Sequence, residues 1–100
     1  MIRHLALFTL SDKARDEGLE KVLDKLRHSA VNMVGKIPGL LRVELNFNGA
    51  KNSPHDLIFY SEFENDAALD EYQRNPIHEE HKQFARDYVG NQEIVDIQSS

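Results

Sequence analysis

Residues 69–81 read LDEYQRNPIHEEH and determine how the second half of the chain folds. Pro76 lacks a backbone N–H and has its φ preset, so it cannot continue the preceding helix but suits the first turn of a new one. The proline also pushes Asn75 out of the α region, where Asn75 can cap the new helix. One helix should therefore end near Gln73 and another begin at Pro76. We expect this rigid corner to bring Tyr72 and His78 face to face.

On either side of this corner, the spacing of apolar residues predicts four strands and one long helix. One strand alternates cleanly, with Leu41, Val43, Leu45 and Phe47 on one face. Ser11 or Asp12 can cap the long helix, and Pro38-Gly39 ends it. The expected elements are strands at 2–10, 40–47, 56–63 and 93–98, helices at about 14–36, 66–73 and 76–89, and a polar loop from Asn48 to Pro54.

The expected element order is β-α-β-β-α-α-β, within a single domain that spans residues 1–100. With right-handed crossovers, this order folds into a ferredoxin-like split βαβ sandwich of the α+β class. Its sheet has four antiparallel strands, and the helices cover one face.

The helix-free face of this sheet is expected to carry Leu5, Leu7, Ile58 and Tyr60. An exposed apolar patch of this kind usually marks an interface. Two copies that pack their open sheet faces together in a C₂ homodimer would cover it.

The composition is that of an ordinary soluble protein, with 12 Lys and Arg against 17 Asp and Glu, for a net charge of −5. Because no basic face forms, a nucleic-acid partner is not expected. The chain contains no Cys, which excludes disulfides and thiolate metal sites. The apolar start reaches Asp12 and Lys13 too soon for a signal peptide or a membrane span. We therefore expect a cytoplasmic protein without a membrane partner.

With these elements placed, the chain resembles the stress-responsive A/B barrel (Dabb) family of dimeric α+β barrel proteins. The resemblance covers essentially the whole chain and implies the split βαβ fold and a dimer formed through the sheets. The motifs that carry it are Arg3-His4-Leu5, Ile37-Pro38-Gly39-Leu40, Asp56-Leu57, Ser61-Glu62-Phe63, Ala68-Leu69 with Tyr72-Gln73, and Pro76-Ile77-His78.

The family includes a plant polyketide cyclase, which performs an intramolecular aldol condensation. By position, the resemblance implies that His78 matches its general base, Tyr72 a residue that hydrogen-bonds the base or substrate, and His4 a pocket-wall histidine. The sequence departs from that pattern at two positions. Asn75 replaces a histidine that is frequent before the proline, and Leu57 stands where the cyclase has a second wall histidine.

We expect a cavity between sheet and helices that holds a small apolar or aromatic molecule. Its predicted walls are His4, Phe8, Leu26, Phe59, Tyr72, His78 and Phe84. An alternative is a cofactor-independent cyclase or lyase with His78 as base and Tyr72 as hydrogen-bond donor. A third is a cofactor-free, quinol-type monooxygenase. His78 can equally well serve only to pack the start of its helix.

His78 and His81 also form an H-x-x-H pair, a spacing that suits two metal ligands. No residue is clearly placed to provide the third ligand, so no metal site is predicted. No cofactor motif is present either.

Overall fold

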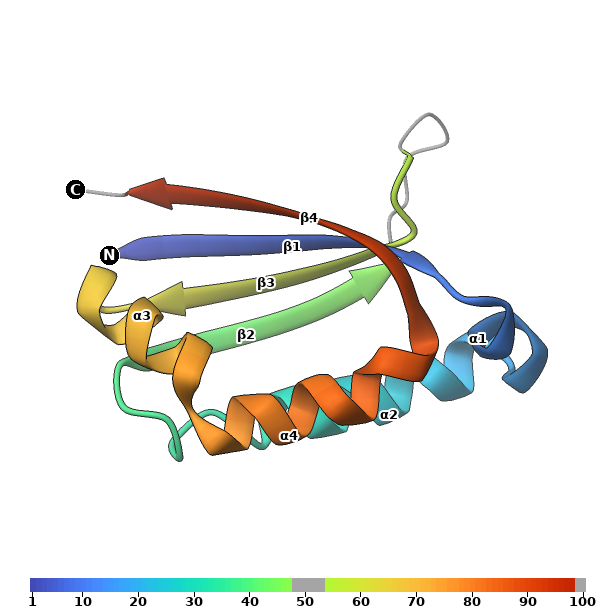
Figure 1. Ribbon diagram of the computed structural model, residues 1–100, viewed down its shortest axis with the longest axis horizontal. Helices are drawn as coiled ribbons and strands as arrows, with labels where there is room; N and C mark the ends of the chain where they lie inside the picture. The colour runs from blue at the N-terminus through green and yellow to red at the C-terminus, as the bar shows by residue number, and fades with distance from the viewer. Residues whose placement is uncertain (48–53, 99–100) are drawn as a thin grey trace.

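The computed structural model describes residues 1–47 and 54–98 (Figure 1). The polar loop expected from Asn48 to Pro54 lies, except for Pro54, outside these residues. The elements are β1 (Ile2–Leu10), α1 (Asp12–Glu17), α2 (Leu19–Val31), β2 (Leu40–Phe47), β3 (Leu57–Phe63), α3 (Asp66–Arg74), α4 (Pro76–Ala85), the 3₁₀ turn η1 (Arg86–Tyr88) and β4 (Val89–Gln98).

The four strands form one antiparallel sheet in the order β2-β3-β1-β4. The helices lie on one side of the sheet, and the start of β1 and the end of β4 lie side by side at the same end of it (Figure 1). This architecture confirms the predicted split βαβ sandwich. None of the helices in the described part of the chain combines the length and apolarity needed to cross a bilayer.

The corner between α3 and α4 forms as the sequence predicts. The Asn75 side chain accepts a hydrogen bond from the Ile77 N–H at 2.9 Å, which caps α4. The Asn75 N–H donates to the Tyr72 carbonyl at 3.2 Å, which closes the last turn of α3. Because both bonds involve the same residue, the two helices meet at a fixed angle with no loop between them.

The long helix expected over 14–36 is wrong in its extent. Ser11 caps a helix that begins at Asp12, and Gly18, at φ +108°, separates α1 from α2. This φ lies in a region that glycine adopts readily and other residues rarely do. The helix ends at Val31, after which a series of turns still places Met33 and Ile37 in the core.

Two strands also differ from their predicted patterns. A register shift between Leu40 and Arg42 places Leu40 in the core and leaves Leu41 46% exposed, although Leu41 was expected to share one face with Val43 and Leu45. An extra residue in one strand of a pair shifts the alternation of faces, which explains this error. The last strand starts at Val89 rather than at 93, because the helix before it ends early in the turn η1.

The side chains of Leu5, Leu7, Ile58 and Tyr60 lie on the face of the sheet opposite the helices. They alternate along β1 and β3 with residues that the helices bury, and each remains partly accessible. Leu5 pairs with Tyr60 and Leu7 with Ile58, so the four form one contiguous patch.

Candidate functional site

The rings of Tyr72 and His78 stack across the corner between α3 and α4. Their centroids are 3.7 Å apart and their planes differ by 25°. Tyr72 comes from the last turns of α3 and His78 from the first turn of α4, and each is less than one-tenth exposed. The predicted juxtaposition of these two residues is therefore present.

Beside this pair lies an inner cavity of about 180 Å³ between the sheet and the helices. Five of the residues predicted to form a pocket line it: His4, Phe8, Phe59, Tyr72 and His78. The rest of the wall is made by Ala6, Gln73, three further residues of α4 (His81, Lys82 and Ala85) and residues of β4. Most of the predicted set is thus gathered around one space.

Two predicted pocket residues lie elsewhere. Leu26 lines a separate void of about 30 Å³, deeper in the core. Phe84 is 42% exposed and does not line this cavity. On α4, His78 and Ala85 face the sheet while Ile77 and Phe84 lie on the neighbouring stripe, which faces α2. The apolar spacing of α4 fits both stripes, so it did not show which one meets the sheet.

His4 is held at the cavity wall by a carboxylate. It lies opposite Asp96 in the register of β1 and β4, and its Nδ1 is hydrogen-bonded to Asp96 Oδ1. Its ring makes edge contacts with those of Tyr72 and Phe63, at centroid distances of 6.3 and 6.2 Å. His4 is therefore a firmly oriented wall residue.

Burial keeps Tyr72 and His78 uncharged at neutral pH. Burial, with smaller contributions from Lys82 and His81, lowers the pKa of His78 to about 4. Burial raises the pKa of Tyr72 above its ordinary value. The Nδ1 atom of His78 is buried and has no hydrogen-bond partner among the described residues. A polar atom in this state needs an explanation, because buried polar groups are nearly always paired.

His81 also lines the inner cavity, although it was not among the predicted pocket residues. It is 8% exposed. Its Nδ1 is 2.7 Å from the Ser29 Oγ of α2, and its ring makes an edge contact with Phe59 at 5.7 Å. Burial lowers the pKa of His81 to about 4. In the sequence, the only indication that His81 faces inward is its position in the apolar stripe of α4.

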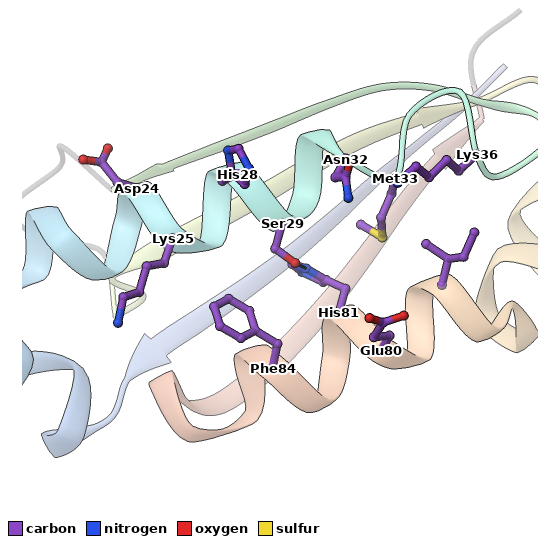
Figure 2. A pocket seen from close by; sticks show the side chains of 11 residues that line it. Asp24, Lys25, His28, Ser29, Asn32, Met33, Lys36, Glu80, His81 and Phe84 are labelled. Atoms are coloured by element: carbon purple, nitrogen blue, oxygen red, sulfur yellow. Dashed lines mark hydrogen bonds between the residues drawn. The ribbon is translucent and has the colours of Figure 1, made fainter.

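A second and larger hollow, the outer groove, lies between α2 and α4 (Figure 2). Its volume is about 820 Å³. Met33, Ile77 and Phe84 make its apolar part, and polar side chains such as Lys36 and Glu80 surround them. Figure 2 shows Ser29 and His81 meeting between the two helices.

No group of three or more His, Asp or Glu side chains is arranged to hold a metal ion within residues 1–47 and 54–98. His78 and His81 both face the inner cavity together with His4, whose Nδ1 is hydrogen-bonded to Asp96.

Comparison with known families identifies the fold. The model of the Stress responsive A/B Barrel Domain, or Dabb, matches residues 2–99. The chain belongs to the Dabb family. Among proteins with curated descriptions, none matches this Dabb chain.

Solved structures share the Dabb architecture. A dimeric protein of unknown function with a ferredoxin-like fold from Bacteroides fragilis is 21% identical, with a TM-score of 0.82 over 98% of this chain and 95% of that one. The Arabidopsis thaliana protein At3g17210 is 20% identical, with a TM-score of 0.80 over 100% and 96%. A Dabb family protein with a ferredoxin-like fold from Mesorhizobium loti is 24% identical, with a TM-score of 0.74 over 99% and 96%. At these identities, the likeness establishes the fold.

Proposed function

We propose that this Dabb protein binds a small aromatic molecule with one polar group in the inner cavity. The unpartnered Nδ1 of the buried His78 carries this proposal. Leaving a buried polar atom unpaired destabilises a fold by about 1–3 kcal/mol. Because this atom has almost no accessible surface, the ring must turn for a ligand hydroxyl to hydrogen-bond the nitrogen and remove that penalty.

The size and lining of the cavity set the class of ligand. A dry cavity of about 150 Å³ is known to hold one benzene ring, whereas drug-sized ligands need about 300 Å³ or more. The inner cavity, at about 180 Å³, suits a single ring. Its aromatic wall, which includes Phe8, Phe59 and Tyr72, favours a planar apolar guest.

The test compares phenol with toluene, which has a similar size but lacks the hydroxyl. Isothermal titration should show tighter binding of phenol. His78→Leu removes both ring nitrogens and keeps an apolar side chain, so it should weaken phenol about three- to tenfold without a matching effect on toluene. The matched control is His28→Leu on the exposed side of α2, which should change neither affinity. An equal effect of His78→Leu on both ligands would contradict the proposal.

A second candidate is a cofactor-free cyclase or lyase. Here His78 takes a proton from a carbon next to a carbonyl, and Tyr72 donates a hydrogen bond to the enolate oxygen. The stacked contact of these two uncharged side chains supports it. Binding is favoured over this reaction because an imidazole with a pKa of about 4 is a weak base, which limits the driving force for proton removal.

The same variant separates the two functions. Exchange of the methyl protons of acetophenone for deuterium, followed by NMR, reports proton removal from carbon. An enzyme should accelerate this exchange and lose about a hundredfold or more of that rate in His78→Leu. A binding protein should leave the exchange at its uncatalysed rate.

The protein also forms a homodimer in this proposal, through the patch of Leu5, Leu7, Ile58 and Tyr60. The partly accessible apolar side chains on the helix-free face support this assembly. The related Bacteroides fragilis protein is described as dimeric, which supports it independently.

A further inference from the structure

The inner cavity and the outer groove come closest at His81. Among the described residues, His81 alone lines both hollows, and it also lines the small void beside Leu26. The remaining walls of the cavity and of the groove are made by different residues. The side chain of His81 is therefore the partition between a ring-sized space and a larger one.

This partition is held in place from both sides. Ser29 of α2 anchors the Nδ1 atom of His81 at 2.7 Å, across the boundary between the two helices (Figure 2). Phe59 of β3 packs an edge contact against the ring from the side of the sheet. With these two contacts and almost no exposure, the ring has little freedom to move aside.

The outer groove, on the far side of His81, is suited to an apolar substituent of the ligand. Met33, Ile77 and the 42% exposed ring of Phe84 line the outer groove next to His81. In Figure 2 the Phe84 ring points into the gap between the helices, on the same side as His81. An alkyl substituent that extended from the inner cavity past His81 would contact this apolar surface first.

We infer that His81 is the specificity-determining residue on the α2 side of the site, because its side chain closes the inner cavity against the outer groove and keeps a ligand substituent from entering that groove. This inference rests on the proposed function. It adds which residue limits the length of the ligand and where a longer ligand would extend.

The test measures the affinity of 4-butylphenol relative to phenol by isothermal titration. In the wild-type protein, the butyl chain should bring no gain. His81→Ala should raise the affinity ratio about tenfold or more, because each methylene buried in the groove adds up to about fourfold. His81→Phe restores a ring of similar size and should keep the wild-type ratio. His81→Val, which truncates the side chain less than alanine, replaces His81→Ala if thermal melts show that the latter is unfolded.

A second variant tests where the butyl group of the ligand lies. Phe84→Ser in the His81→Ala background should reduce the gain for 4-butylphenol, because Phe84 lines the groove and not the inner cavity. A full gain despite Phe84→Ser would overturn the role of the groove. Phenol binding without a gain in His81→Ala, or with an equal gain in His81→Phe, would overturn the inference alone. Absence of phenol binding to the wild-type protein would overturn the proposed function, and this inference with it.

Discussion

Three buried histidines surround the inner cavity, and they differ in their hydrogen bonds. His4 is paired with the carboxylate of Asp96, and His81 with the hydroxyl of Ser29. His78 leaves its Nδ1 without a partner among the described residues. The two paired rings act as fixed walls, so the unpaired Nδ1 of His78 is the natural contact for a guest molecule.

The lowered pKa values of His78 and His81 predict a loss of stability in mild acid. The pKa of each is about 4 in the folded protein, against about 6.5 for an unfolded histidine. As the pH falls from 6.5 to 4, the unfolded chain takes up protons that the folded protein does not, so the free energy of unfolding decreases. Each histidine contributes up to about 3 kcal/mol to this decrease. Urea denaturation at several pH values measures it.

The matched control for this prediction is the double variant His78→Leu/His81→Phe. It should show a weaker dependence on pH between 4 and 6.5, because the two groups no longer titrate in the unfolded state. His28→Ala, which removes an exposed histidine, should keep the wild-type dependence. Identical pH profiles for the wild-type protein and the double variant would show that His78 and His81 do not cause the loss of stability in acid.

At the scale of the elements, Gly39 connects the turns after α2 to β2 and lies against α3. Its φ is +81°, and an added Cβ would lie 2.4 Å from the Cβ of Ala68. Gly39→Ala should therefore combine backbone strain with a clash, and lower the free energy of unfolding by about 2–4 kcal/mol. Urea denaturation measures this loss.

Gly35→Ala is the matched control, because Gly35 has a similar φ of +88° but nothing lies within 4 Å of an added Cβ. Only backbone strain applies at Gly35, so the free energy of unfolding should fall by about 1–2 kcal/mol. Equal losses at Gly35 and Gly39 would show that the contact between the Gly39 turn and α3 does not matter for stability.

At the scale of the whole molecule, the open face of the sheet predicts a specific defect in assembly. The wild-type protein should have a mass of twice 11.5 kDa in light scattering after size-exclusion chromatography. Leu7→Asp places a charge in the middle of the apolar patch, so it should shift the equilibrium toward the monomer. The measurement is repeated over a range of protein concentrations.

Val31→Asp provides the control for Leu7→Asp. Val31 is 60% exposed at the end of α2, on the side of the helices, so the same change there should leave the dimer intact. A dimer that persists in Leu7→Asp with unchanged stability would rule out the proposed interface.

Local physical chemistry in the sequence was sufficient for most of the fold. The proline at 76 and the capping side chain of Asn75 act within a few residues of each other, so the corner and the Tyr72–His78 contact could be predicted. The alternation along β1 and β3 likewise identified the open face. Gly18 was overlooked, because an apolar stripe continues across it although the helix breaks there.

The rest of the site depended on how distant elements pack. Phe84 and His81 both fit an apolar stripe of α4, and only the packing of α4 against the sheet and α2 decides which stripe turns inward. The partition at His81 requires Ser29, which is 52 positions away in the chain. The sequence by itself determined the elements, their corner and the open face, because caps, turns and periodicity are local. The tertiary structure alone decided the boundary between cavity and groove, since that boundary exists only where α2, α4 and β3 meet.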